Sequence, residues 1–190
     1  AILRLAELER GRICIDGVDI AAVPLSVLRE RVASVPQEPL VLSGTLRRNL
    51  LPRRGRPDEE AQCWAMLDTL GLGAAVRAWP KGLDTELAAG DEGLLSLGQR
   101  QLLGLGRSLL RGATVLCVDE ATAHVDGPTD AALQRALLDG PARQRATRLT
   151  VAHRLWTLRH CDEVLLLRPG SPTQVHRIEN PGAECLVSGK

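Results

Sequence analysis

The most regular pattern of apolar and polar positions in the chain lies between Ser96 and Gly112. Apolar or small residues recur there at helical spacing, at Leu102, Leu103, Gly106, Leu109 and Leu110. Ser96 precedes them and Gln99 follows it by three residues, which is the arrangement of a capping box. Gly112 can adopt the left-handed backbone that closes a helix. We therefore predict a helix that begins at Ser96 and ends before Gly112.

A short continuous apolar run, from Val115 to Val118, follows this helix. Its length and its β-branched residues predict a strand that is buried on both faces of a parallel sheet. Asp119 and Glu120 come directly after it. Because ligands bind beyond the carboxyl ends of such strands, one acid can hold Mg²⁺ while the other orients a water molecule. An acid pair at this place is also common in solvated turns, so the pair alone does not decide between the two interpretations.

Patterns elsewhere in the chain predict further elements. In chain order they are a strand with a turn over residues 13–20, a helix from Pro24 to about Arg31, a strand over 32–35, a helix over about 58–70, short helices and loops over 71–93, a helix over 129–138, and strands over 147–152 and 164–167. Strands that alternate with helices indicate a parallel sheet with right-handed crossovers. The tail from Arg168 is rich in Gly, Pro and Ser, and we expect it to be irregular.

Two of these stretches also bear on possible binding surfaces. In the helix before Gly71, the residues expected on the packed face are Ala61, Trp64, Leu67 and Leu70. Trp64 is thus predicted to be a core residue rather than a platform on which a base stacks. The arginine-rich stretch 46–56 favours a solvated face, and a contact with a membrane-side partner is the less favoured alternative.

The composition is that of a globular protein with one sizeable core, since 44% of the 190 residues are hydrophobic and 25% are charged. Phe and Tyr are absent, so the core must be packed mostly by Leu, Val and Ala. A net charge of +1 gives no reason to expect a nucleic-acid partner. No apolar run approaches the 18 or so residues that cross a membrane. The five cysteines lie far apart without a CxxC pair, which favours free thiols.

Taken together, the motifs resemble those of the ATP-binding cassette (ABC) ATPases. Residues 95–99, LSLGQ, are similar to the signature loop LSxGQ, residues 115–120 to the Walker B strand with its Glu, and residues 123–126 to the D-loop. The resemblance extends from about Ile2 to Leu167. Residues 36–50, PQEPLVLSGTLRRNL, most resemble the second nucleotide-binding domain of the multidrug-resistance-associated (C) subfamily of exporters. Glu120 agrees with a second domain, because first domains of that subfamily commonly lack this acid.

This resemblance implies an α/β fold of the P-loop NTPase (RecA-like) type, with a parallel-sheet core and an inserted α-helical subdomain. We expect residues 1–40 to be a remnant of the β-subdomain and of the core up to the Q-loop. Residues 41–107 would form the helical subdomain, residues 108–168 the core with Walker B, D-loop and H-loop, and residues 169–190 an irregular tail. Since the chain starts at Ala1 and its only methionine is Met66, we expect an N-terminally truncated part of a longer protein.

The resemblance also implies the chemistry of four residues. Asp119 would hold Mg²⁺, with Gln37 as the Q-loop glutamine that reaches the metal and the water. Glu120 would act on the attacking water, and His153 would be the H-loop histidine that contacts the γ-phosphate. Taken singly, Gln37 would be a polar residue at a strand end, and a lone histidine such as His153 is more often structural.

Contacts with ATP are implied for the signature and D-loops. Ser96, Gly98 and Gln99 would face a γ-phosphate bound by an opposite domain, and Asp126 would link the two domains. His124 stands in the D-loop where the family usually has a small residue, so we expect it to crowd the seam between the domains. The expected partners are a second nucleotide-binding domain and the transmembrane domains of the same transporter, at the cytosolic face of a membrane.

The chain contains no GxxxxGK[ST] loop, which in the family cradles the phosphates. The resemblance places that loop upstream of Ala1, so we expect the 190-residue chain alone to be inactive. A rival hypothesis is a degenerate or truncated module that regulates or binds without hydrolysing ATP. A third, a soluble ABC ATPase for repair or translation, is disfavoured by the near-neutral charge and by the exporter-like segment that includes Gln37.

Overall fold

The structure of the chain is a computed structural model, and it describes residues 1–52, 58–89, 93–119, 126–139, 146–151, 161–166 and 174–177. The chain divides into two compact units, Ala1–Thr150 and Val151–Lys190. This division does not coincide with any boundary of the predicted subdomains, which therefore stay a prediction. No helix among the described residues is both long enough and apolar enough to cross a bilayer.

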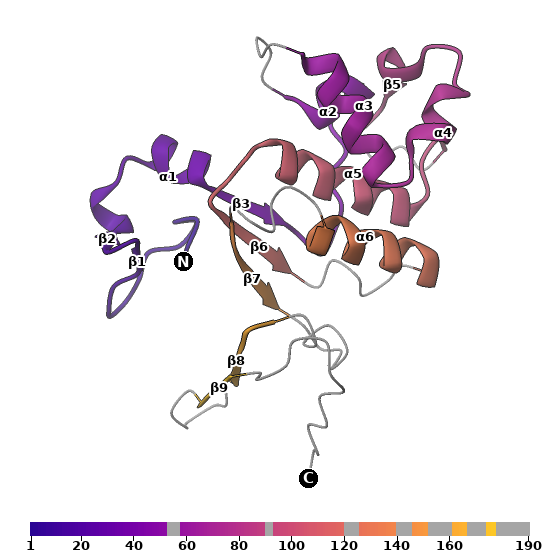
Figure 1. Ribbon diagram of the computed structural model, residues 1–190. Coiled ribbons are helices and arrows are strands. Elements are labelled where there is room, and N and C mark those ends of the chain that lie inside the picture. Colours follow the sequence, from indigo (N-terminus) through magenta and orange to yellow (C-terminus); the bar gives the residue numbers. More distant parts are fainter. Residues whose placement is uncertain are drawn as a thin grey trace. The chain divides into compact units, whose positions relative to one another are not determined.

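A parallel pair of strands lies at the centre of the first unit (Figure 1). Strand β3 (Val32–Val35) pairs with β6 (Val115–Asp119), and β7 (Thr147–Val151) follows on the other side of β6. Leu116 and Val118 belong to the larger cluster of buried side chains, whereas Val115 packs in a separate cluster with Ile20, Leu28 and Val32. Because alternate residues of a strand point to opposite faces, β6 is covered on both faces, as predicted.

The predicted strand and turn near the N-terminus form a short antiparallel hairpin. Strands β1 (Cys14–Ile15) and β2 (Val18–Asp19) are joined by Asp16 and Gly17, both of which have positive φ. A short 3-10 helix, η1 (Ile20–Ala22), leads to helix α1 (Leu25–Arg31). Pro24 directly precedes α1, where its missing N–H costs no helical hydrogen bond.

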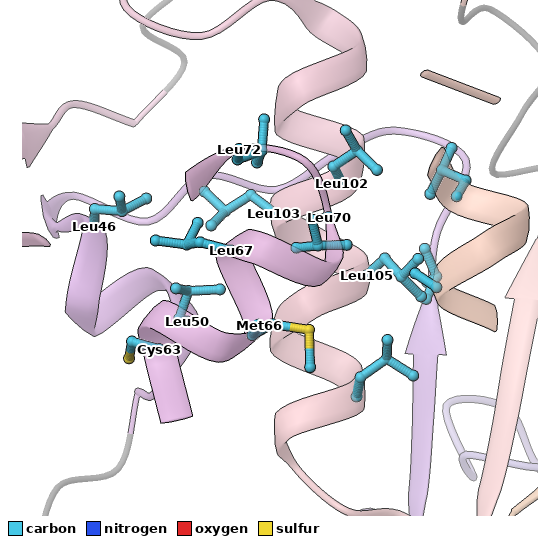
Figure 2. Close-up of a cluster of buried hydrophobic side chains, with 14 of the residues drawn as sticks. Leu46, Leu50, Cys63, Met66, Leu67, Leu70, Leu72, Leu102, Leu103 and Leu105 are labelled. Carbon is cyan, nitrogen blue, oxygen red and sulfur yellow. The ribbon is translucent and has the colours of Figure 1, made fainter. Parts of the chain in front are cut away.

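Short helices and one two-stranded antiparallel sheet occupy residues 44–87 (Figure 1). They are β4 (Gly44–Thr45), α2 (Leu46–Leu50), α3 (Glu59–Thr69), α4 (Gly73–Arg77), η2 (Gly82–Asp84) and β5 (Glu86–Leu87). Helix α5 (Leu97–Leu110) packs against α2 and α3, and Figure 2 shows the leucines and sulfur-containing side chains that fill the space between them. The helices and loops predicted over residues 58–93 are confirmed here, whereas helix α2 and the antiparallel pair of β4 and β5 were not predicted.

The packed face of α3 differs in part from the prediction. Leu67 and Leu70 are buried as predicted, but Ala61 is exposed, and Cys63 and Met66 are buried without having been predicted. The predicted residues were spaced three apart, and at 3.6 residues per turn such a row drifts off one face. Trp64 lies at the margin, partly buried against the core, and the guanidinium of Arg77 lies 4.7 Å from the centroid of its ring. This position agrees with a structural Trp64 rather than a base-stacking platform.

The remaining elements lie after residue 126. Helix α6 (Gly127–Asp139) begins two residues before its predicted start and buries Leu133, Ala136 and Leu137, as predicted. In the second unit, β8 (Glu163–Leu166) matches the predicted strand within one residue. It pairs in antiparallel fashion with β9 (Gln174–Arg177), a strand that lies within the tail expected to be irregular.

Candidate functional site

The carboxyl ends of β3 and β6 bring Gln37 and Asp119 to the same edge of the sheet. Val35 pairs with Val118 in a parallel ladder, so the segments that follow β3 and β6 leave the sheet side by side. Asp119 is the last residue of β6, Gln37 follows β3 by two residues, and both are exposed. A carboxylate and an amide oxygen are donors that Mg²⁺ accepts. The predicted metal-binding pair is therefore placed at one edge, as the fold requires.

A Mg²⁺ ion fits this edge of the sheet only if groups other than these side chains complete its coordination. The described residues hold no group of three or more His, Cys, Asp or Glu side chains that could cage a metal ion by themselves. Proteins usually hold Mg²⁺ through one or two carboxylates, with water and phosphate oxygens filling the other positions. The exposed carboxylate of Asp119 suits that role. Glu120, His124 and His153 lie outside the described residues, so their predicted roles stay predictions.

The signature turn is built by the predicted capping box. Ser96 Oγ accepts a hydrogen bond from the main-chain N–H of Gln99 at 3.2 Å, and Gln99 Oε1 accepts one from the N–H of Ser96 at 3.0 Å. Leu95 is buried and fixes the turn to the core, while Ser96 itself is exposed. A hydroxyl that accepts one hydrogen bond can still donate its own hydrogen. Ser96 can therefore donate to an anion at the N-terminus of α5, where the helix dipole favours negative charge.

The contact between α5 and α6 joins two further predicted residues, Gly98 and Asp126. A Cβ atom on Gly98 would stand 2.8 Å from Thr129 Cγ2 and 2.9 Å from Thr129 Oγ1, so any other residue would force the side chain of Thr129 to move. The main-chain N–H of Thr129 donates to Asp126 Oδ1 at 2.8 Å. The hydrogen bond from the side chain of Thr129 lowers the pKa of Asp126 most, and the bond from its main-chain N–H adds to this effect. Asp126 is therefore ionised at neutral pH. Thr129 was missed in the sequence, where nothing marks it.

Two polar side chains of α5 hold the strand that leads to Gln37. Gln101 Nε2 donates to the main-chain oxygen of Gln37 at 2.8 Å, and Ser108 Oγ donates to that of Ser34 at 3.0 Å. Both are buried. They lie seven residues apart, or two helical turns, on the face that is otherwise filled by leucines. That spacing of polar residues within an apolar stripe is the signal by which the sequence could have revealed them.

The opposite side of α5 is tied to α2 through Asn49, which is fully buried. Arg107 donates to Asn49 O at 2.6 Å and to Asn49 Oδ1 at 2.9 Å. The amide of Asn49 also exchanges hydrogen bonds with the main-chain N–H and C=O of Leu42, each at 2.8 Å. Burial lowers the pKa of Arg107 from its ordinary value. This network fixes the turn after the Q-loop to the signature helix.

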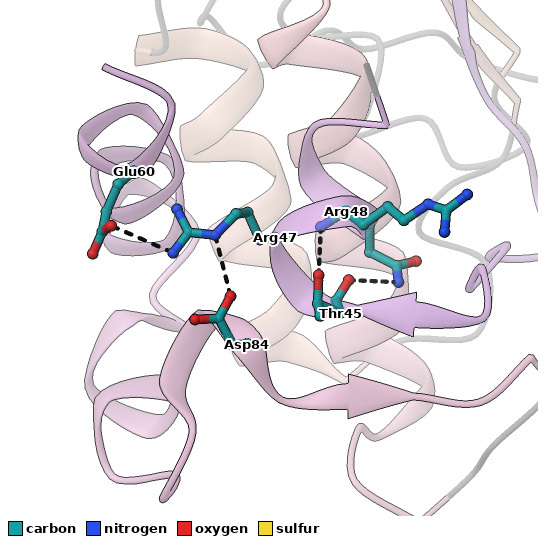
Figure 3. A network of polar contacts seen from close by, with 6 residues as sticks. Thr45, Arg47, Arg48, Glu60 and Asp84 are labelled. Atoms are coloured by element: carbon teal, nitrogen blue, oxygen red, sulfur yellow. Dashed lines mark hydrogen bonds and ion pairs between the residues drawn. The ribbon is translucent and has the colours of Figure 1, made fainter. Parts of the chain in front are cut away.

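The arginine-rich stretch is only partly a solvated face. Arg48 is exposed, but Arg47 lies between Glu60 and Asp84 (Figure 3), at 3.4 Å and 3.3 Å respectively. Burial opposes the charge of Arg47, yet the hydrogen bonds and charges of Asp84 and Glu60 outweigh it and raise its pKa. Arg47 therefore joins α2, α3 and η2, while residues 53–57 of the stretch lie outside the described residues.

Comparison with known proteins now places these motifs in a family. The sequence profile described as "ABC transporter" matches residues 1–123, which is more than half of the chain. The chain belongs to the ABC transporter family. Its predicted fold class, an α/β P-loop NTPase, and the predicted resemblance to the C subfamily are both confirmed.

Several relatives belong to sub-family C. ATP-binding cassette sub-family C member 2 of Homo sapiens is 41% identical over 186 residues, which cover 95% of this chain and 12% of that protein. ATP-binding cassette sub-family C member 10 of Mus musculus is 44% identical over 183 residues, covering 96% of this chain and 12% of that protein. The chain thus spans about an eighth of the length of these curated relatives, 12% in each case.

A solved structure supports the same assignment. The chain is similar to a bacterial Atm1-family ABC exporter solved with ATP bound, with a TM-score of 0.77 and 29% sequence identity. The similarity covers 88% of this chain and 28% of that one. The chain is accordingly part of an ATP-binding cassette, as the signature and Walker B motifs indicated.

Proposed function

We propose that this chain is part of the second nucleotide-binding domain of an ABC exporter, in which ATP binding and hydrolysis drive transport through transmembrane domains. The observation that carries the proposal is the parallel register of β3 and β6, because it sets Gln37 and Asp119 at one edge of the sheet. The similar Atm1-family exporter was solved with ATP bound, which supports ATP as the nucleotide. The domain would lie at the cytosolic face of the membrane.

The residues at the sheet edge would divide the work of hydrolysis. Asp119 and Gln37 would hold Mg²⁺, which supplies positive charge to the phosphates when bound. Glu120 would accept a proton from the attacking water, and His153 would donate a hydrogen bond to the γ-phosphate. The chain itself carries no GxxxxGK[ST] loop, and in this proposal the cradle for the phosphates would come from other residues of the full-length transporter.

The signature turn would act on a different ATP molecule. Ser96 is exposed at the capped N-terminus of α5 and can donate its hydroxyl hydrogen to a γ-phosphate held by a second nucleotide-binding domain. Gly98 keeps the turn close to α6, and Gln99 completes the cap. Asp126, ionised beside Thr129, would contact the opposite domain. Each ATP site would therefore need two domains.

The proposal is tested by Glu120→Gln in the full-length transporter. Hydrolysis should slow by roughly 100-fold or more, the scale of a lost general base, while ATP binding is retained. Glu38→Gln is the matched control, because it removes an exposed acid beside Gln37 that has no assigned role and should keep the wild-type rate. Unchanged turnover in Glu120→Gln removes Glu120 from the mechanism. A wild-type protein that binds ATP without hydrolysing it would favour the rival, a non-hydrolytic regulatory or interaction module.

A further inference from the structure

The side chain of Gln101 is buried in the second turn of α5, with only 5% of its surface exposed. Its Nε2 donates to the main-chain oxygen of Gln37 at 2.8 Å. Its Oε1 is also buried and has no hydrogen-bond partner among the residues that the structure describes. Turning the amide over would place Oε1 against the oxygen of Gln37, so the bond to Gln37 would be lost. The contact with Gln37 therefore fixes the orientation of Gln101.

The buried amide of Gln101 is not explained by a contribution to stability alone. A hydrogen bond within a protein contributes little net free energy, whereas a buried acceptor without a partner costs more than such a bond returns. Helix α5 is already held against β3 by the bond from Ser108 to Ser34, and its leucines Leu103 and Leu105 are completely buried in the core. An apolar side chain at position 101 would pack on the same face without the buried orphan oxygen. The gain from a glutamine must lie elsewhere.

We propose that Gln101 is a positioning residue for the nucleotide site, which holds the main chain at Gln37 so that this residue is presented beside Asp119. The inference rests on the proposed function of that sheet edge. Gln37 lies beyond the last paired residue of β3, so the ladder with β6 no longer fixes it. Gln101 holds the main chain at this point with a hydrogen bond to the oxygen of Gln37. It also ties Gln37 to the helix that begins at the signature turn, so the two motifs share one rigid support.

The test compares Gln101→Met with Ser108→Ala in the full-length transporter. Both variants remove one hydrogen bond from α5 to the same stretch of chain, but only Gln101→Met removes the bond to Gln37. Methionine is of similar length and has no amide oxygen to leave unpaired. We expect Gln101→Met to keep or raise the thermal midpoint and to lower ATP turnover by about 10- to 100-fold, the usual effect of losing a group that orients a metal ligand. Ser108→Ala should lower the midpoint and keep the turnover.

Hydrogen–deuterium exchange of the nucleotide-free protein supplies a readout that does not depend on activity. The amides of Gln37, Glu38 and Leu40 should exchange faster in Gln101→Met and at the wild-type rate in Ser108→Ala. Gln101→Leu is a second variant without the amide, in case methionine perturbs the packing. It should show the same lower ATP turnover and the same faster exchange.

Wild-type exchange and wild-type turnover in Gln101→Met would overturn the inference. The inference would also be overturned if Gln101→Met lost turnover only in proportion to a lower thermal midpoint, as much as Ser108→Ala does. Failure of the proposed function gives a different result, because the wild-type transporter would then show no hydrolysis while the exchange of Gln37 still reports on Gln101.

Discussion

Helix α5 contains two interior glycines, Gly104 and Gly106, which should respond in opposite directions to replacement by alanine. Glycine in a helix interior costs about 1 kcal/mol relative to alanine. A Cβ atom on Gly104 would meet no heavy atom within 4 Å, and Gly104 does not have a positive φ. Gly104→Ala should therefore stabilise the protein by up to about 1 kcal/mol.

At Gly106 the packing outweighs this gain. An added Cβ would stand 2.8 Å from Leu70 Cδ1 and 3.2 Å from both Leu50 Cδ2 and Met66 Cγ, in the core shown in Figure 2. All three neighbours are buried, so they have little room to move. Overpacking of this kind costs about 1–3 kcal/mol. After the helical gain of about 1 kcal/mol, Gly106→Ala should change stability by between about 0 and 2 kcal/mol, in the destabilising direction.

Urea unfolding measures both changes. Trp64 and Trp79 pack against this core, so their fluorescence reports its loss. The free energies of unfolding of the two variants should differ by about 1–3 kcal/mol, with Gly104→Ala the more stable. Equal stabilities, or a Gly106→Ala variant more stable than Gly104→Ala, would show that α5 does not approach α2 and α3 as closely as described.

Four further predictions concern the network of Asn49, the ionisation of Asp126, the role of His124 and nucleotide binding by the 190-residue chain. Asn49→Ala removes the side-chain oxygen that accepts from Arg107 and the amide that bonds the main-chain N–H and C=O of Leu42, whereas the bond from Arg107 to the main-chain oxygen of residue 49 remains. The variant should cost about 3 kcal/mol in urea unfolding, so a change below about 1 kcal/mol would contradict the network. The pKa of Asp126 is lowered from 3.8, so its ionised form contributes stability that is present above that value and lost as the pH falls through the lower, folded-state pKa. Since asparagine caps a helix without titrating, the stability difference between wild type and Asp126→Asn should be constant above about pH 5 and change below 3.8, and a flat difference down to about pH 2 would refute this. His124→Ser in the full-length transporter should raise or keep ATP turnover, and a large loss at every pH would show that His124 has an essential role. The 190-residue chain, titrated with Mg·ATP in a calorimeter, should show no micromolar binding, because it lacks the GxxxxGK[ST] loop.

Local signals explain what could be predicted about α5 and β6. The two ends of α5 are set by Ser96 with Gln99 and by Gly112, which lie within a few residues of the backbone groups that they satisfy. The strand β6 was recognisable because burial on both faces leaves an unbroken apolar run.

Contacts between distant segments could not be predicted in the same way. Gln101 and Gln37 are 64 positions apart, and their hydrogen bond depends on how α5 packs against β3. The fit of Gly98 against Thr129 likewise depends on the approach of α5 to α6. Strand β9 was missed because all four of its residues are exposed, so burial imposes no pattern on them. The assignment of Gln37 and Asp119 needed the family resemblance as well, since a lone polar residue at a strand end has no distinctive signal.

A cryo-EM map of the full-length transporter carrying Glu120→Gln, prepared with Mg·ATP, tests the proposed nucleotide contacts most directly. We predict density for Mg²⁺ beside Asp119 and Gln37, and a γ-phosphate from the opposite domain's ATP at Ser96 and the first turn of α5. A map in which the bound nucleotide contacts neither the carboxyl edge of β3 and β6 nor the N-terminus of α5 would contradict this prediction.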